Sequence, residues 1–366
     1  MINNLATISS VLSSVLYGLE ALAVLLFMVT IHEFGHYIAG KKLGFKINEF
    51  AIGFGPALFK KKMKSGELFS VRALPLGGYC AFEGEDEESA SDKSFEKQAP
   101  WKRIIVLLAG ALTNFFVTVL IVIITYTASG QYVFTVGKVL PNDVGDTTEV
   151  RYILKENDVI LSVNDVDIYM PSELTATLKK AAETPDTPVF LEIVRDGERM
   201  TVEAKIRNYV LSYTDEKGEA VETHAQGLGI LQSSSLYKFG FFESVKRANV
   251  YCFKMAGEVL SVIGQLFTGR LSIDSLSGPI STITATAEIA SYGFRQLLEI
   301  VTLIGVNLAV FNLLPIPALD GCKVLFTIIE WIRGKAINKK IEGIVNFAGF
   351  VFLIGFAILV DLLKVI

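Results

Sequence analysis

The stretch "VTIHEFGHYIAG" (Val29–Gly40) places two histidines and a glutamate inside a long apolar part of the N-terminal sequence. This apolar part runs from about Val11 to Gly40, and no Lys or Arg precedes Lys41. It is longer than the apolar region of a signal peptide, so it predicts a retained transmembrane helix. Ionisable side chains are costly inside a bilayer and usually mark function there. The stretch therefore predicts a membrane protein with a functional site inside the membrane.

The composition supports a membrane protein with a sizeable water-exposed part. Of the 366 residues, 51% are hydrophobic and 20% are charged, and the mean hydropathy is +0.46. The net charge of -4 argues against a nucleic-acid partner. Three cysteines, an odd number (Cys80, Cys252 and Cys322), imply no disulfide framework.

Three further apolar stretches are long enough to cross a bilayer, which gives about four transmembrane helices in all. They cover roughly Ile104–Thr127, Leu297–Leu319 and Ile344–Leu363. Residues 41–103 carry 12 Lys and Arg and residues 333–340 carry four, whereas the first 40 residues carry none. By the positive-inside rule, the two basic connections are cytoplasmic and both chain ends lie outside.

The segment after Lys41 contains two strand-like runs broken by Gly and Pro. The runs "NEFAIGFGPALFKKK" (Asn48–Lys62) and "GELFSVRALPLGGYCAFEGE" (Gly66–Glu85) predict β-hairpins. One interpretation is a sheet that lines a cavity within the membrane, because an open sheet edge cannot face lipid. Such an edge could pair with an extended peptide. The other interpretation is a cytoplasmic hairpin that rests on the membrane surface.

The long segment between the second and third spans has the composition of a soluble domain. Strand, helix and hairpin follow one another in "DVILSVNDVDI" (Asp158–Ile168), "PSELTATLKKAAE" (Pro171–Glu183) and "VFLEIVRDGERMTVEAKI" (Val189–Ile206). This order resembles a PDZ domain, although Asn157 and Asp165 stand where that family usually has glycines. No carboxylate-binding loop is evident.

After this domain, residues 241–268 have amphipathic helical spacing. The helix could lie on the outer membrane surface or pack against the spans.

The histidines of the first span have the spacing of a zinc site. His32 and His36 lie one helical turn apart on one face, as in the pattern H-E-x-x-H, in which Glu33 faces the attacking water. A pair of hydrogen-bonded core histidines is the structural alternative. A catalytic zinc takes a third protein ligand, and Asp320, which closes the third span in "NLLPIPALDG", has the matching depth. As an alternative or an additional role, Asp320 could cap a helix that begins near Gly321.

Four motifs together resemble the site-2 protease family of intramembrane zinc metalloproteases. They are "HEFGH" (His32–His36), "AGALTNF" (Ala109–Phe115), "LSGP" (Leu276–Pro279) and "NLLPIPALDG" (Asn312–Gly321). The resemblance covers nearly the whole chain and, with one PDZ-like insert, points to the bacterial members. One departure from the family pattern is Cys322, where a glycine commonly stands.

The resemblance implies a set of roles. It implies that His32, His36 and Asp320 bind Zn2+, that Glu33 is the catalytic base, and that Asn312 holds substrate near the metal. The turn at Gly53 and Gly55 matches the membrane-dipping β element of the family, which favours the cavity interpretation and a role in substrate binding.

The resemblance also implies substrates, partners and location. The substrates would be single-span membrane proteins already trimmed by an upstream site-1-type protease, either anti-sigma factors or signal-peptide remnants. The enzyme would be a multi-pass protein of the bacterial inner membrane, in contact with lipid. Its active site would face the cytoplasm, and its PDZ-like domain would be extracytoplasmic.

The expected fold is an α-helical polytopic membrane protein with membrane-associated β-hairpins and an inserted α+β PDZ-like domain. Its predicted divisions are residues 1–127 (two spans and the β region), 128–210 (the PDZ-like domain), 211–296 (a linker and amphipathic helices) and 297–366 (two spans).

Two other functions would account for part of the sequence. A membrane scaffold built on the PDZ-like domain leaves the intramembrane H-E-x-x-H unexplained. A zinc-coupled transporter usually has repeats of broken helices, and the second half of the sequence does not resemble the first.

Overall fold

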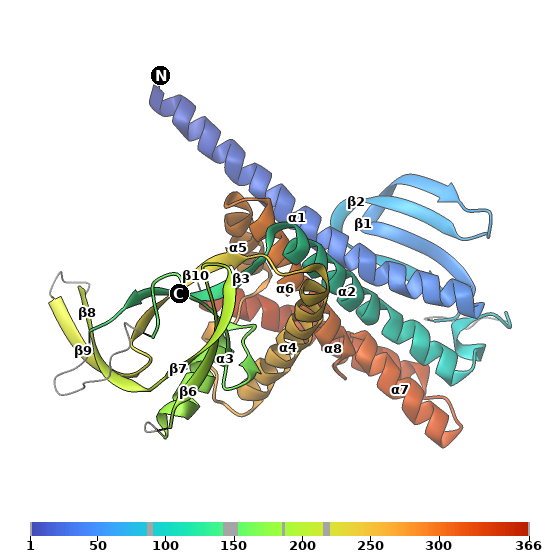
Figure 1. Ribbon diagram of the computed structural model, residues 1–366. Coiled ribbons are helices and arrows are strands. Elements are labelled where there is room, and N and C mark those ends of the chain that lie inside the picture. Colours follow the sequence, from blue (N-terminus) through green and yellow to red (C-terminus); the bar gives the residue numbers. More distant parts are fainter. Residues whose placement is uncertain (1, 86–90, 142–152, 185–186, 215–219, 365–366) are drawn as a thin grey trace. The chain divides into compact units, whose positions relative to one another are not determined.

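A computed structural model describes residues 2–85, 91–141, 153–184, 187–214 and 220–364 (Figure 1). The chain divides into two compact units. The first contains residues 1–122 and 252–366, and the second contains residues 123–251. The divisions fall inside helices α2 (Pro100–Ser129) and α4 (Phe241–Phe267), so each of these helices contributes to both units.

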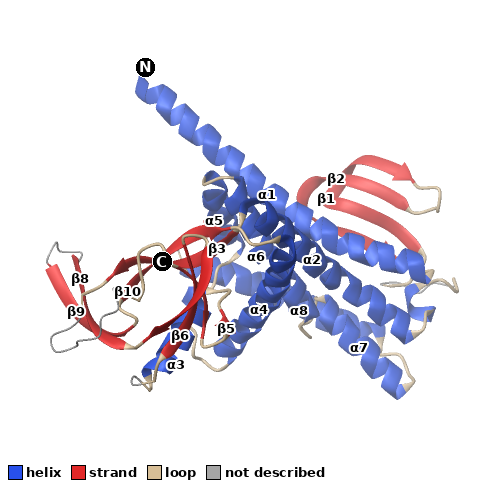
Figure 2. Cartoon of the chain, in the orientation of Figure 1, coloured by secondary structure: helices blue, strands red, loops and turns tan. Residues whose placement is uncertain are grey.

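Long apolar helices dominate the first unit (Figure 2). Besides parts of α2 and α4, the unit contains α1 (Ile2–Leu43), α5 (Pro279–Ser291), α6 (Phe294–Leu313), α7 (Asp320–Arg333), α8 (Lys339–Leu363) and the short 3-10 helices η1 (Phe95–Lys97) and η3 (Ile273–Ser275). By length and composition, five described helices could cross a membrane: α1, α2, α4, α6 and α8. The prediction of a polytopic membrane protein is therefore confirmed.

The five helices include one more than the sequence predicted. Helix α4, which the sequence assigned to the membrane surface or to packing against the spans, has a mean hydropathy of 1.3, the lowest of the five. Helices α2 and α8 reach 2.5 and 2.4. Their large side chains remain exposed in the isolated chain, for example Phe116 at 66% and Phe352 at 65%. Apolar groups in such positions are typical of a surface that faces lipid.

The third predicted span is shorter than expected. It was predicted to end at Leu319, but α6 ends at Leu313, and a second helix, α7, begins at Asp320. Pro315 and Pro317 account for the break, because a proline disfavours helical geometry in the residue before it and cannot donate a backbone hydrogen bond. The predicted helix near Gly321 is confirmed, with Leu319 rather than Asp320 at its N-cap.

Helices α1 and α6 run in the same direction. Val24 and Met28 of α1 share an apolar cluster with Val301 of α6, and Leu297 and Leu308 pack against that cluster. Further along both helices, His32 of α1 meets Asp320, just beyond the end of α6. The contacts therefore follow one another in the same order along α1 and along the α6–α7 segment, as expected for two segments that run in the same direction.

The predicted hairpin region forms a sheet of two long, bent strands. Strands β1 (Ile47–Lys62) and β2 (Leu68–Phe82) pair antiparallel, which confirms the predicted hairpin. Residues 49–52 of β1 lie between two parts of β2, with residues 68–71 on one side and 78–81 on the other. The residues around Gly78 therefore lie at an edge of the sheet.

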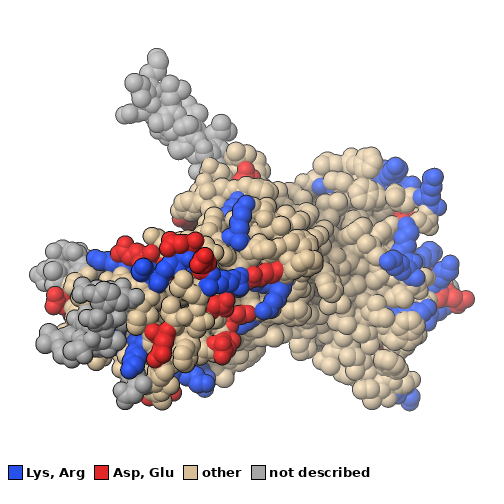
Figure 3. Space-filling view, in the orientation of Figure 1, with Lys and Arg blue, Asp and Glu red and all other residues tan. Residues whose placement is uncertain are grey.

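Two features shape the hairpin and hold it to α1. Gly53 bends β1 with a φ of 87°, and a side chain there would strike the carbonyl oxygens of Arg72 and Leu74. Glu67 accepts hydrogen bonds from Lys41 Nζ and Tyr37 Oη, both 2.8 Å long. Burial raises the pKa of Glu67, but these hydrogen bonds outweigh burial and lower it to about 2. In Figure 3, Lys and Arg gather where β1, β2 and the end of α1 lie.

The second unit contains a six-stranded sheet with the order β10-β3-β4-β6-β7, in which β5 pairs with β4. Its elements are β3 (Gln131–Val139), β4 (Val159–Val163), β5 (Val166–Asp167), α3 (Pro171–Ala182), β6 (Val189–Arg195), β7 (Glu198–Ala204) and β10 (Ile230–Tyr237). Strands β8 (Arg207–Thr214) and β9 (Ala220–Gly227) form a separate pair. Leu174 of α3 packs with Ile160, Val163 and Leu191 in the core.

The two residues that replace expected glycines in this unit occupy turn positions. Asn157 has a φ of 73° and Asp165 a φ of 61°. Asn and Asp are the residues other than glycine that most readily adopt this left-handed conformation. Both residues are therefore compatible with the turns that they form.

An acidic residue of α8 fixes the short helix α5. Both carboxylate oxygens of Asp361 accept hydrogen bonds at the start of α5, from the Ile280 N–H (2.9 Å), the Ser281 N–H (3.0 Å) and Ser281 Oγ (2.8 Å). A side chain at Gly278 would collide with the Asp361 carboxylate. The "LSGP" motif thus gives α5 a glycine that admits this carboxylate and a proline in its first turn.

Replacement of Asp361 with Ala should lower the stability of the fold without affecting metal content. Three donors lose their acceptor, so we expect the free energy of unfolding to fall by about 1–3 kcal/mol. Denaturant unfolding in detergent micelles measures the loss. Asp361→Asn, which keeps one acceptor oxygen, should lose less. Equal stability of Asp361→Ala and the wild type would contradict a capping role.

Candidate metal centre

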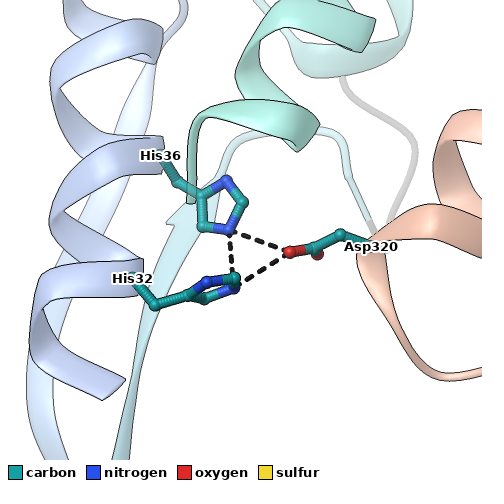
Figure 4. A group of neighbouring side chains, drawn as sticks. All are labelled: His32, His36 and Asp320. Atoms are coloured by element: carbon teal, nitrogen blue, oxygen red, sulfur yellow. Dashed lines mark hydrogen bonds and ion pairs between the residues drawn. The ribbon is translucent and has the colours of Figure 1, made fainter. Parts of the chain in front are cut away.

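Two histidines of α1 direct their Nε2 atoms to the same point (Figure 4). His32 and His36 lie one helical turn apart, and their Nε2 atoms are 3.2 Å from each other. Both side chains are only 8% exposed. The sequence prediction that these two residues share one face of a helix is confirmed.

Asp320 completes the cluster from the first residue of α7. Its Oδ2 atom lies 2.9 Å from His32 Nε2 and 3.1 Å from His36 Nε2 (Figure 4). Within the described part of the chain, these three side chains are the group of His, Cys, Asp and Glu residues that could hold a metal ion. The structure therefore brings together the three residues that the sequence singled out as ligands.

The hydrogen bonding of His36 tests whether a cation fits here. His36 Nδ1 lies 2.8 Å from the carbonyl oxygen of Val106 on α2. A carbonyl only accepts, so Nδ1 carries a proton, and Nε2 is the nitrogen whose lone pair a neutral ring can offer to a cation. A carboxylate and two imidazole nitrogens at this spacing suit a divalent cation. Ligands about 2.0–2.1 Å from a tetrahedral zinc lie about 3.3 Å apart.

Two glycines allow α2 to approach the histidines closely. A side chain at Gly110 of α2 would collide with the rings of His36 and His32. A side chain at Gly35 of α1 would collide with the carbonyl oxygen of Ala109. The close contact of the two helices therefore depends on a glycine on each side, and it brings the Val106 carbonyl within reach of His36.

The loop between α6 and α7 has its own supports, which fix the position of Asp320. The Ala318 N–H donates to Asn346 Oδ1 of α8 (3.3 Å), and Ala318 has a φ of 76°. Gly349 of α8 packs so closely on Pro317 that a side chain would not fit. A side chain at Gly321 would likewise strike the carbonyl oxygen of Leu314. These contacts direct the first turn of α7 toward α1.

Glu33 lies beside the three candidate ligands, in the sheet-facing part of α1. Its carboxylate interacts with His36, His32 and Asp320 and with the backbone of Cys80. A Cβ atom at Gly78 would lie 3.7 Å from its Cγ. Glu33 therefore faces the edge of β2, next to the cluster but outside the three-residue group.

The residues predicted to bind substrate have local contacts. Asn312, in the last turn of α6, donates from Nδ2 to the Leu308 carbonyl of its own helix (2.9 Å). Gly53 and Gly55 both have positive φ values, 87° and 79°, and the Gly55 carbonyl accepts from Arg72 Nη1 (2.7 Å). These contacts account for the position of the Asn312 side chain and for the turn at Gly53 and Gly55. The substrate role of these residues remains a prediction.

Two other acidic residues of the apolar helices, Glu299 and Asp361, have partners away from the three-residue group. Glu299 pairs with Arg295 (3.4 Å), and Asp361 caps α5. Sequence reasoning did not anticipate the parts played by Val106, Gly110, Asn346 and Gly349. The glycine in the middle of a span, within "AGALTNF", was the available signal for Gly110, whereas a backbone carbonyl such as that of Val106 leaves no signal in a single sequence.

Comparison with known proteins agrees with this geometry. The family model for peptidase family M50 matches residues 20–356. A candidate zinc metalloprotease of Clostridium perfringens is 30% identical over 362 residues, which cover 96% of this chain and 99% of that protein. The zinc metalloprotease RasP of Shouchella clausii is 27% identical over 412 aligned residues, which cover 91% of this chain and 94% of that protein.

The family match spans most of the chain and includes the helices that carry the histidines and the aspartate. The relatives match over nearly their whole length and are named for zinc-dependent proteolysis. The chain therefore belongs to peptidase family M50, the site-2 protease family, and is a multi-pass membrane zinc metalloprotease.

Proposed function

We propose that the chain hydrolyses peptide bonds within transmembrane segments of single-span membrane proteins, with His32, His36 and Asp320 as zinc ligands and Glu33 as catalytic base. The convergence of two imidazole nitrogens and one carboxylate oxygen within 3.2 Å of one another carries this proposal. Three protein ligands are typical of a catalytic zinc, which keeps a further position for water or substrate. A structural zinc would usually have four.

The proposed mechanism assigns the proton transfers to Glu33. Zinc, when bound, polarises the scissile carbonyl and makes the attacking water more acidic. Glu33 takes a proton from this water as it attacks and then gives the proton to the leaving amine. His36 is held with Nε2 as a lone-pair donor because its Nδ1 proton is bonded to Val106. Asp320 supplies the negative charge that offsets a dication in a low-dielectric environment.

The substrate would bind in an extended conformation at the edge of β2. A transmembrane helix keeps its carbonyls in internal hydrogen bonds, so it must unwind before attack. The sheet edge around Gly78 lies beside Glu33, and an extended peptide could add to it as a further strand. Gly53 and Gly55 would maintain the bend that places this edge, and Asn312 would hold the substrate near the zinc.

The proposed orientation puts the site toward the cytoplasm of a bacterial cell, in the inner membrane. Lys41, Lys42 and the run Lys60–Lys62 follow the site in the chain, and the positive-inside rule assigns such clusters to the cytoplasm. Because α1 and α6 run in the same direction, both would enter from outside. The second unit would then be extracytoplasmic.

We further propose that the second unit is a PDZ-like domain that restricts access by size. Its sheet with one packed helix and the turn residues Asn157 and Asp165 support this assignment. Substrates would first lose their bulky outer domains to an upstream site-1-type protease. Anti-sigma factors and signal-peptide remnants are the substrate classes that fit such prior trimming.

Glu33→Gln should abolish proteolysis while keeping zinc. The amide cannot take up the proton, so we expect turnover to fall by about 10²–10⁴-fold. Zinc content should stay at the wild-type level, because Glu33 lies outside the ligand group. Cleavage of a model membrane peptide in detergent measures the first quantity, and metal analysis the second. Turnover close to that of the wild type would refute the assignment of the base.

Asp320→Asn should weaken zinc binding itself. The change keeps the shape but removes the charge, so the loss of affinity should exceed the about 10–100-fold that is typical of an outer-shell partner. Zinc per protein after mild chelation is the measurement.

Glu299→Gln and Asp361→Asn are the matched controls for Asp320→Asn, since both remove an intramembrane carboxylate whose partners lie elsewhere. If Asp320→Asn retained zinc and either control lost it, the third ligand would be a residue other than Asp320.

Removal of residues 131–237 should allow untrimmed substrates to be cut. The structure makes this deletion practical, because β3 and β10 pair from Gln131 to Tyr237 and Gly130 packs against Tyr237, so the two cut ends are adjacent. Cleavage of substrates with and without a bulky outer domain is compared before and after deletion. A folded, zinc-loaded deletion protein that has lost cleavage of trimmed substrate would contradict the size filter.

A further inference from the structure

Asn114 is a buried polar residue of α2 whose side chain has no assigned partner. It is 0% exposed, and within the described structure neither its Oδ1 nor its Nδ2 atom has a hydrogen-bond partner. Buried side-chain amides in proteins are almost always hydrogen-bonded, so such a residue calls for a functional explanation. The residue lies in the "AGALTNF" motif, to which the proposed mechanism gives no chemical role.

The neighbours of Asn114 along α2 show what it faces. Gly110, one turn earlier, lies against the rings of His36 and His32. Thr118, one turn later, lies with Met28 of α1 against Gly305. Residues four apart share a helix face, so Asn114 faces α1 between the level of His32 and that of Met28.

The direction of helix side chains brings the amide closer to His32. Side chains on a helix lean toward its N-terminus and cover the preceding turn. The preceding turn here carries Gly110, and the rings of His36 and His32 lie where a side chain at Gly110 would be. The carboxamide of Asn114 is therefore expected to lean toward these rings.

One ring nitrogen of His32 also lacks a hydrogen-bond partner in the described structure. Its Nε2 atom faces Asp320 and His36, but its Nδ1 atom is buried and has no partner among the described residues. His36, in contrast, has its Nδ1 atom 2.8 Å from the Val106 carbonyl. A histidine that binds a metal almost always donates its other ring N–H to an acceptor, which fixes the tautomer and the direction of the ring.

We propose that Asn114 is the positioning residue for His32 when the metal is bound: its Oδ1 atom then accepts the Nδ1–H of His32, a bond that these two unpartnered atoms do not form in this structure, and holds Nε2 as the metal-binding nitrogen. Helix α2 would then orient both histidines, one through the Val106 backbone carbonyl and the other through the Asn114 side chain. This inference rests on the proposed zinc site and adds a residue to its outer shell. Asn114 contacts neither the metal nor the reacting atoms in this role.

Zinc affinity tests the proposal with three variants of the full-length protein. Asn114→Leu has a similar size and no acceptor, so we expect zinc affinity to fall about 10–100-fold. Asn114→Asp keeps an acceptor at the same place and should retain most of the affinity. Thr118→Val is the matched control, because it removes a buried hydroxyl one turn away on the same helix face. Competition with a chromogenic chelator gives each dissociation constant.

Nitrogen NMR of the histidines gives a readout that a packing role would not change. The chain has only three histidines, so selective 15N-histidine labelling gives few signals. With zinc bound, we expect the His32 Nδ1–H to be protonated and hydrogen-bonded in the wild type. Its proton shift should change in Asn114→Leu, while the signals of His36 and His224 stay in place.

The outcomes separate this inference from the zinc proposal. Zinc binding by the wild type with equal affinity in Asn114→Leu would overturn the role of Asn114 alone. So would a loss in Asn114→Asp as large as that in Asn114→Leu, since this would mean that an acceptor oxygen at this position does not maintain the affinity. Failure of the wild type to bind zinc would overturn both proposals. If Asn114→Leu does not fold, a wild-type His32 Nδ1 without a hydrogen-bonded proton still overturns the inference.

Discussion

The convergence of three electron-rich atoms in an apolar environment is the constraint on which the rest of the structure depends. His32 Nε2, His36 Nε2 and Asp320 Oδ2 approach one another to 2.9–3.2 Å. Without a positive charge among them, such an arrangement inside a bilayer would be strongly unfavourable. Helix packing on one side and a supported loop on the other bring these atoms together, and a bound cation would offset their charge.

These two supports are built differently. On the α1–α2 side the helices approach closely through Gly35 and Gly110, so a backbone carbonyl can orient an imidazole. On the other side, two prolines end α6, and the loop before Asp320 is fixed by contacts from α8. The first support is rigid because regular helices pack along their length. The second relies on a proline-broken backbone, which a membrane tolerates only where protein surrounds it.

Much of this arrangement could be predicted from the sequence, because the signals were local and physical. The spacing of His32 and His36 places them on one helix face, and the Pro-rich segment before Asp320 marks a broken helix at the matching depth. The end of α6 was predicted six residues too late, because hydropathy continues through prolines that helical geometry does not tolerate. The support that Asn346 and Gly349 give to the loop could not be predicted, since it depends on how α8 packs and on no pattern in the chain.

The glycines at the helix contacts have a consequence for genetics. Gly35, Gly110, Gly321 and Gly349 carry no chemistry, yet each lies where even one added methyl group would meet backbone or a ligand ring. A screen for inactive alleles should therefore recover Gly-to-Ala or Gly-to-Ser changes at these codons, alongside changes at the ligands. Such alleles would produce full-length, membrane-inserted protein. Because these clashes are with backbone, with a proline or with a ligand ring, a smaller side chain on the facing helix would not relieve them, so suppressors of that kind should be rare.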